Sequence, residues 1–69
     1  MSEVVVRVNG EPRAFPGGLA ISALLSELGV STPRVAVERN REIVPKSRYD
    51  SVRIEEGDGI EVVEFVGGG

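Results

Sequence analysis

The sequence contains no cysteine and no histidine among its 69 residues. Without cysteine, the chain can form neither a disulfide nor a thiolate metal site, and it has no cysteine nucleophile. Without histidine, it lacks the commonest general base and metal ligand. Few catalytic sites can be built from the residue types that remain. We therefore expect a protein that is not an enzyme and that holds no metal ion.

Aromatic residues are few, and runs of basic residues are missing. The only aromatic residues are Phe15, Tyr49 and Phe65, too few for a platform on which nucleic-acid bases stack. The net charge is −3, and the eight basic residues are scattered along the chain, which argues against a nucleic-acid partner. No stretch has the pattern of a signal peptide or the length of a membrane span. Since a protein without disulfides suits the cytoplasm, we expect a cytoplasmic protein that binds neither nucleic acid nor membrane.

What is present is typical of one small folded domain. Apolar residues make up 41% and charged residues 28% of the chain, as in ordinary globular domains. A chain of this length forms a single domain and is only marginally stable. We place that domain at 1–66 and expect 67–69 to form a flexible tail, because glycine-rich ends are usually disordered.

The first part of the sequence predicts a β-hairpin. Over Glu3 to Val8, β-branched residues alternate between two faces, as in a strand. Asn9-Gly10 is a strong hairpin signal, because both central positions of a type I′ turn need a positive φ. Glu11 to Phe15 would return beside the first strand. Pro12 lacks an N–H group, so the returning strand should lie at a sheet edge.

The next segment changes to the period of a helix. Ile21, Leu24, Leu25 and Leu28 fall at the i, i+3, i+4 and i+7 positions of one amphipathic face. Gly29 stands where a left-handed C-terminal cap is expected. The N-terminal cap is poorly signalled, with Gly18 as the best candidate.

Three further strands are predicted after the helix, at 34–38, 42–44 and 60–65, with a turn at Asn40. The resulting order is β-β-α-β-β-β. One helix can cover one face of one sheet, so the fold class is α+β, a two-layer domain with a mixed sheet of four to five strands.

The last strand should be central, because it is apolar at consecutive positions. If Ile60 and Val62 face the helix, the residues between and after them face the open side of the sheet. An exposed apolar patch on a small domain usually marks a partner surface. The residues expected to bind a partner are Val5, Val63, Phe65 and Val66.

The element order, the short length and the glycine terminus resemble the ubiquitin-like β-grasp sulfur carriers. Among these, the chain is most similar to the ThiS-like family, which serves thiazole formation in thiamin biosynthesis. Arg41 departs from the family pattern, which often has glycine after the turn asparagine, and leaves the type of that turn open. The resemblance covers nearly the whole chain and is carried by 4–10, 22–28, 35–38, 42–45, 57–63 and 67–69.

This resemblance implies a reactive end. A partner similar to the ubiquitin-activating enzymes, a ThiF-like (E1-like) adenylyltransferase, would join the Gly69 carboxylate to AMP. A persulfide sulfur donor would convert the acyl adenylate to a thiocarboxylate, and a ThiG-like thiazole synthase would take the sulfur. Gly67 and Gly68, without side chains, would let the tail enter a narrow partner cleft. The carrier, expected to be a monomer when free, would need no cofactor, because the activating partner consumes the ATP.

Other readings stay open at this point. Within the same fold, the small subunit of molybdopterin synthase also ends in Gly-Gly, and ubiquitin-like protein modifiers are further neighbours. A β-grasp interaction module with an incidental glycine tail is possible, because fold alone does not settle function. Glu55, Glu56 and Asp58 could be proposed as an acid–base pair or a calcium loop, but charged turn residues are usually just solvated.

Overall fold

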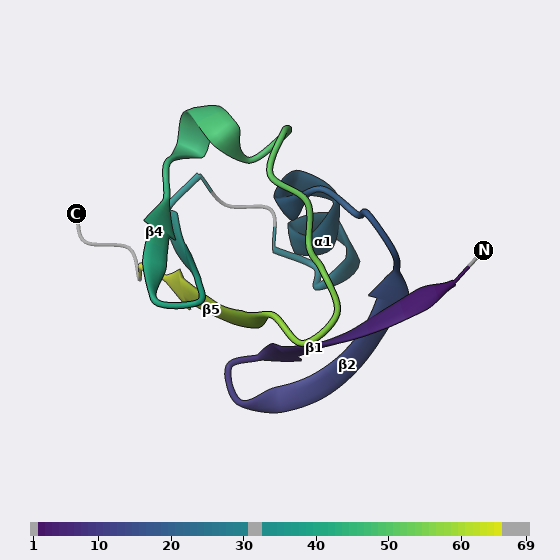
Figure 1. Ribbon diagram of the computed structural model, residues 1–69. Coiled ribbons are helices and arrows are strands. Elements are labelled where there is room, and N and C mark those ends of the chain that lie inside the picture. Colours follow the sequence, from purple (N-terminus) through teal and green to yellow (C-terminus); the bar gives the residue numbers. More distant parts are fainter. Residues whose placement is uncertain (1, 31–32, 66–69) are drawn as a thin grey trace.

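A computed structural model describes residues 2–30 and 33–65. The predicted order of strands and helix is confirmed, and a short 3₁₀-helix, η1, lies in the polar segment before the last strand (Figure 1). The elements are β1 (Glu3–Val8), β2 (Glu11–Pro16), α1 (Ile21–Glu27), β3 (Val35–Arg39), β4 (Glu42–Val44), η1 (Lys46–Arg48) and β5 (Gly59–Glu64).

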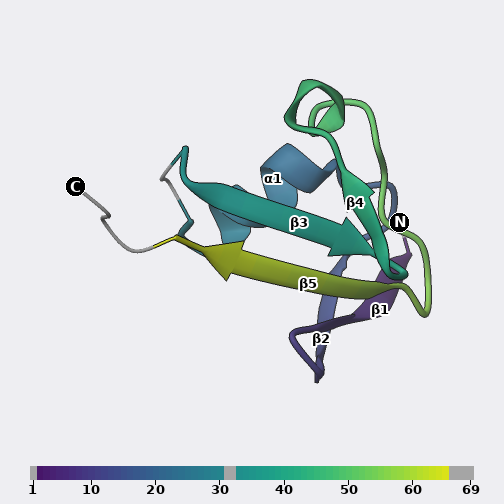
Figure 2. The same cartoon turned by 90° about the vertical axis from the view of Figure 1, so that its left-hand side faces the viewer.

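The strands form one mixed sheet in the order β2-β1-β5-β3-β4. β1 and β5 run parallel, and the other neighbouring strands are antiparallel. The predicted central position of β5 and edge position of β2 are both confirmed. Figure 2 shows β3 and β5 side by side, with α1 behind them on one face of the sheet.

The core lies between α1 and the sheet. Alternate strand residues point inward, since successive side chains of a strand face opposite sides. Each fully buried aliphatic side chain contributes roughly 1.5–3 kcal/mol relative to an exposed one. The buried apolar residues are Val6, Val8, Phe15, Ile21, Leu24, Leu25, Val35, Val37, Val44, Ile54 and Ile60.

The start of α1 differs from the sequence prediction. The N-cap is Ala20, not Gly18, and it makes no side-chain capping bond. The first-turn N–H groups of Ile21 and Ser22 instead donate to the Val52 and Tyr49 carbonyls, each at 2.9 Å. A neighbouring loop thus satisfies donors that a capping side chain would otherwise bind. For this reason the start of α1 cannot be predicted from the residues next to it.

Two turns connect the antiparallel hairpins, and both have a positive φ at each central residue. Asn9 and Gly10 have φ values of 51° and 86°, and Asn40 and Arg41 have values of 53° and 69°. Both fit the type I′ pattern that matches the twist of the strands. Arg41 keeps the turn type despite having a side chain, so it holds a conformation that costs a non-glycine residue about 1–2 kcal/mol.

Candidate functional site: the two ends of the central strand

The predicted reactive end follows β5 directly. The roles predicted for Val66, Gly67, Gly68 and Gly69, and the predicted domain boundary between 66 and 67, fall outside the described residues. The structure does show how the chain is held just before them. The Phe65 N–H donates to the Arg34 carbonyl at 2.8 Å, which extends the β3–β5 pairing by one residue.

Asn9 holds β5 from the other side. Its side-chain oxygen accepts the Val62 N–H at 2.8 Å, and its Nδ2 donates to the Val62 carbonyl at 3.2 Å. The Asn9 backbone N–H also donates to the Ile60 carbonyl at 2.8 Å. The Asn9 side-chain amide therefore bonds both backbone groups of Val62. If β1 were longer, its backbone would make such bonds to β5 at this point. From the sequence, Asn9 indicates only a turn, and no local signal reveals this second role.

The start of β5 is fixed by a buried carboxylate. Asp58 is only 6% exposed. Its Oδ2 accepts bonds from Arg39 Nε and from the Glu55 N–H, both at 2.8 Å, and its Oδ1 accepts one from Asn40 Nδ2 at 3.0 Å. The expectation that Asp58 is a solvated turn residue is wrong, because three donors converge on it and compensate its loss of water.

These contacts set the ionisation of Asp58. Burial by itself raises the pKa of the Asp58 carboxyl, but the hydrogen bonds from Arg39, Asn40 and Glu55, with the positive charge of Arg39, outweigh it. The pKa therefore lies below the ordinary value of 3.8. Asp58 is thus a charged structural group at neutral pH, and nothing in its surroundings suits a proton-transfer role.

The open face of the sheet carries the predicted apolar patch at the far end of β5. Val63 and Phe65 are 51% and 57% exposed. Ala36 lies directly opposite Val63 on β3. We call Ala36, Val63 and Phe65 the exit patch, because they border the point where the described chain ends.

Val5 does not belong to the exit patch, although the sequence suggested a shared surface. It is exposed, but the Gly57 N–H donates to its carbonyl at 2.9 Å. Val5 therefore lies beside Gly57, which is six positions before Val63. At the rise of a strand, six positions place Val5 roughly 20 Å from Val63. The physical reason is the parallel register, in which Arg7 pairs with Gly59 and only the start of β5 runs along β1.

Ile43 is an exposed apolar residue that sequence reasoning missed. It is 74% exposed on β4, opposite Glu38 on the open face. The signal was present in the alternation of Glu42-Ile43-Val44, since Val44 is the buried member. A three-residue strand is too short for that alternation to be decisive without knowing which face is covered.

Over residues 2–30 and 33–65, no group of three or more acidic residues is arranged to hold a metal ion. Within the same ranges, no helix has the length and apolar character needed to cross a membrane.

Comparison with solved structures gives a close match over the whole fold. The crystal structure of a thiamine biosynthesis protein, ThiS, from Geobacter metallireducens superposes with a TM-score of 0.81 at 35% identity. The match covers 96% of this chain and 100% of that one. The β-grasp fold expected from the sequence is thereby confirmed.

Sequence comparisons find both relatives of similar length and much longer ones. The sulfur carrier protein ThiS of Bacillus subtilis is 47% identical over 71% of this chain and 74% of its own length. A thiazole synthase of Paramagnetospirillum magneticum is 55% identical over 90% of this chain, and one of Magnetococcus marinus is 44% identical over 93%. The chain spans only about a fifth of the length of these two synthases.

A family model adds the decisive match. It is described as the ThiS family, and it aligns with residues 6–69, from the middle of β1 through the terminal glycines. Together with the ThiS crystal structure and the Bacillus carrier, this match shows that the chain belongs to the ThiS family.

Proposed function

We propose that this chain is a sulfur carrier that bears its sulfur on the carboxylate of Gly69 and delivers it for thiazole formation in thiamin biosynthesis. The observation that carries the proposal is the family match, which runs through the glycine tail. The Bacillus relative, which is named a sulfur carrier, supports the same function. The exposed exit patch before the tail supplies a surface for the partners that such a carrier needs.

The chemistry explains why the chain itself needs no catalytic group. A carboxylate is a poor acyl donor, because its leaving group would be oxide. An activating partner lets the Gly69 carboxylate attack the α-phosphorus of ATP, which releases pyrophosphate and leaves an acyl adenylate. The terminal sulfur of a persulfide then attacks the acyl carbon and displaces AMP, which gives an acyl disulfide with the donor. A thiol attacks the donor's sulfur in this disulfide, forms a new disulfide with the donor and releases the thiocarboxylate. The carrier is thus a substrate rather than an enzyme, and it needs no cofactor of its own.

The glycines of the tail let the Gly69 carboxylate reach a narrow site on a partner. Gly67 and Gly68 have no Cβ, so the chain can pass close to a partner's backbone and adopt backbone angles that other residues avoid. Ordering the tail costs roughly 1–2 kcal/mol per residue. Burial of the exit patch on the partner offsets that cost, since apolar anchors contribute much of the energy of an interface.

Three partners follow from the proposal: an E1-like (ThiF-like) adenylyltransferase, a persulfide sulfur donor and a ThiG-like thiazole synthase. The third has a specific observation in its favour. Two relatives contain a segment matching this chain and are themselves named thiazole synthase. That pairing favours thiazole formation over the molybdopterin branch and over protein modification. The cytoplasmic location and the monomeric free state remain predictions.

The decisive experiment measures the intact mass of the chain. Incubation with ATP and the cognate activating enzyme should add an adenylyl group, the mass of AMP less one water. A persulfide donor should then leave a gain of about 16 Da over the original chain, the difference between sulfur and oxygen. A chain without Gly69 should fold normally, because the tail follows the last core residue, and should show neither gain. If the intact chain gains no mass, or the shortened chain still does, Gly69 is not the acceptor.

A further inference from the structure

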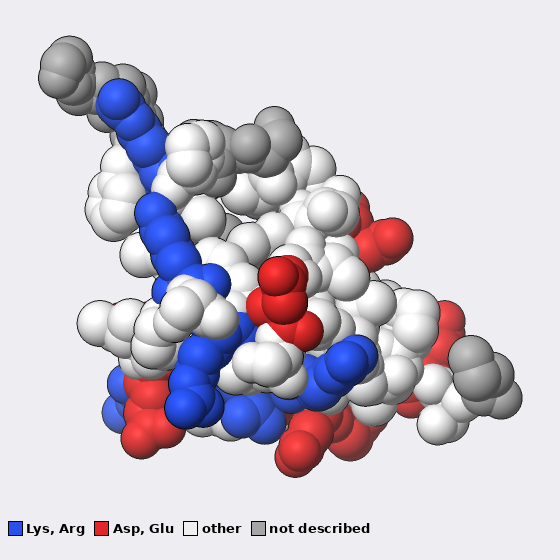
Figure 3. Space-filling view, turned by 90° about the horizontal axis from the view of Figure 1, so that it is seen from above, with Lys and Arg blue, Asp and Glu red and all other residues white. Residues whose placement is uncertain are grey.

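The fold gathers basic residues that the sequence scatters. Six of the eight lie between positions 34 and 53, where only Glu38, Glu42 and Asp50 are acidic. This part of the chain is therefore positive, although the whole chain carries a charge of −3. Figure 3 looks down on the side of η1 and shows Lys and Arg side chains in a band, with acidic side chains beside it and along its lower edge. The six basic residues are Arg34, Arg39, Arg41, Lys46, Arg48 and Arg53.

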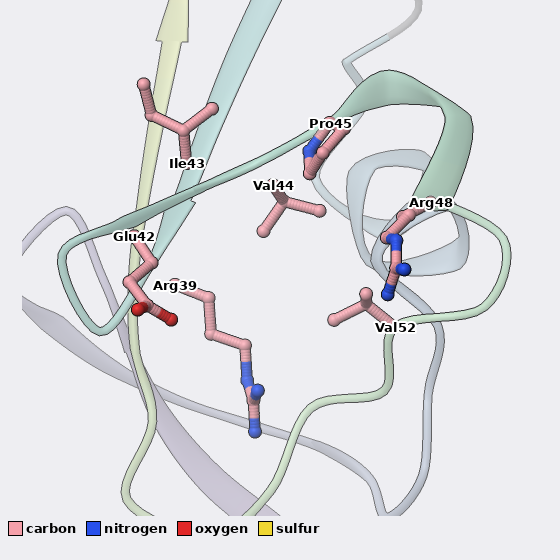
Figure 4. A pocket seen from close by; sticks show the side chains of 7 residues that line it. All are labelled: Arg39, Glu42, Ile43, Val44, Pro45, Arg48 and Val52. Carbon is pink, nitrogen blue, oxygen red and sulfur yellow. The ribbon is translucent and has the colours of Figure 1, made fainter.

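A pocket of about 340 Å³ lies on this side, between β4, η1 and the segment after it. Val44, Pro45 and Val52 give it apolar surface, and Arg39, Glu42 and Arg48 line it with charged groups. Figure 4 shows Arg39 and Arg48 reaching toward it from opposite sides, with the Glu42 carboxylate beside Arg39. The side of the pocket at Arg48 therefore suits an apolar side chain with a carboxylate near it.

The two arginines differ in what already binds them. Arg39 pairs with Asp58 at 2.8 Å and with Glu55 at 3.8 Å, so its charge is neutralised within the fold. The Arg48 side chain is exposed and makes no hydrogen bond or ion pair with another residue of 2–30 or 33–65. Arg48 is therefore the cation that remains available to a binding partner.

The basic side continues to the point where the tail leaves the domain. The Lys46 ammonium group donates to the Pro33 carbonyl, and the carbonyl of the next residue, Arg34, accepts the Phe65 N–H. We call Arg34, Lys46 and Arg48 the basic ridge. A protein that receives the tail beyond Phe65 would lie next to this ridge.

We propose that the pocket and the basic ridge bind an acidic segment of the protein that activates the tail, with an apolar side chain in the pocket and a carboxylate on Arg48. This inference rests on the proposed function and names a second contact surface of the same partner. An apolar pocket surface favours a protein segment over nucleic acid, for which the chain has too few aromatic residues to stack bases. Opposite charges at such a site accelerate association and fix the orientation of the two proteins.

The test measures steady-state AMP transfer to the chain by its cognate activating enzyme, with the carrier concentration varied at two salt concentrations. Arg48→Glu should raise KM about tenfold at low salt and leave kcat unchanged, because it reverses a charge at the rim of an interface. Arg48→Gln, which keeps most of the side-chain stem, should give an intermediate KM. The matched control is Arg13→Glu, the same charge change on exposed Arg13 of β2 at the opposite edge of the sheet.

Salt should raise KM for the original chain and change it much less for Arg48→Glu. Equal KM changes for Arg48→Glu and Arg13→Glu, or no change for Arg48→Glu, would overturn the proposal. So would binding of a single-stranded RNA oligonucleotide that Arg48→Glu abolishes while KM stays constant. Failure of the original chain to accept AMP at all would instead overturn the proposed function, and this inference with it.

Discussion

The two ends of β5 differ in hydrogen bonding and in burial. At its start, Asp58 is buried and receives three hydrogen bonds, and the turn residue Asn40 bonds Gly59 through both its backbone N–H and its side-chain oxygen. At its far end, Val63 and Phe65 leave more than half of their surface in solvent. One strand thus joins the most tightly bonded part of the sheet to the part that offers apolar surface.

This difference shows how a small domain can present a tail without loosening its core. Polar bonds and burial accumulate where the strand begins, so the exposed end can be specialised for binding at little cost in stability. Substitutions at the start of β5 should therefore alter the free energy of unfolding, and substitutions at its far end should alter partner binding.

The largest stability effect is expected at the start of the strand. Asp58→Asn keeps the size of the side chain but places an amide where Arg39 and the Glu55 N–H donate. We expect a loss of about 2–3 kcal/mol in the free energy of unfolding, because buried donors lose a charged acceptor. Urea denaturation measures it. The matched control is Glu55→Gln, which removes the other, 77% exposed carboxylate near Arg39 and should change stability by less than about 1 kcal/mol.

The same group should control stability in acid. Because the folded-state pKa of Asp58 is lowered, its contribution is fully present above the unfolded pKa of about 3.9 and is lost as the pH falls through the lower folded value. Stability should therefore fall as the pH drops below about 4, and the Asp58→Asn chain should show a smaller fall. Identical pH profiles for the two chains would contradict this assignment.

At the far end, Phe65→Ser should act on binding. The side chain is mostly exposed, so we expect a change in unfolding free energy within about 0.5 kcal/mol. If Phe65 anchors the partner, KM for AMP transfer should rise about tenfold or more. Val5→Ser, also exposed but outside the exit patch, is the control and should leave KM nearly unchanged. Equal effects of the two substitutions would mean that the exit patch is not the binding surface.

Asn9 lies in the turn between β1 and β2 and also bonds the middle of β5. Asn9→Ala removes both side-chain bonds to Val62 and the residue's tolerance for a positive φ. We expect a loss of about 1–2 kcal/mol, since each net hydrogen bond contributes about 1 kcal/mol. Amide hydrogen exchange should become faster at Val62 in particular. Asn9→Gly is the control that permits the turn while still removing the bonds, and unaltered Val62 exchange there would contradict the role given to Asn9.

The smallest expected effect is a gain. Arg41→Gly should stabilise the domain by up to about 1 kcal/mol, because glycine adopts the positive φ of 69° without strain. Thermal unfolding measures it, and the added flexibility of the unfolded chain offsets part of the gain. Partner binding through the exit patch should not change. A loss of stability would show that the Arg41 side chain makes a contribution larger than the strain.

Much of this fold was predictable because its signals are local. The alternation over β1, the Asn9-Gly10 turn and the apolar period of α1 each fix an element from neighbouring residues. The consecutive apolar residues of the last strand correctly indicated a central position. The reactive end stays a prediction, and it rests on the family resemblance: the glycines 67–69 alone indicate only a frayed end.

What could not be predicted depends on contacts distant in sequence. Asp58 reads as an ordinary turn residue until Arg39, nineteen positions away, is placed beside it. Val5 could be assigned to the correct face, but its separation from Val63 depends on the register of two strands at opposite ends of the chain. The basic ridge likewise arises only when η1 folds against the residues before β3.

The parallel pairing of β1 with β5 also has a consequence for biosynthesis. β5 is the last of the described strands to leave the ribosome, and it fills the middle of the sheet between β1 and β3. The earlier strands cannot close into one sheet without it, so the sheet can form only after synthesis has passed Glu64. A chain that stops before β5 would lack its central strand. Folding of this domain is therefore tied to synthesis of the strand that directly precedes the residues proposed to carry the sulfur.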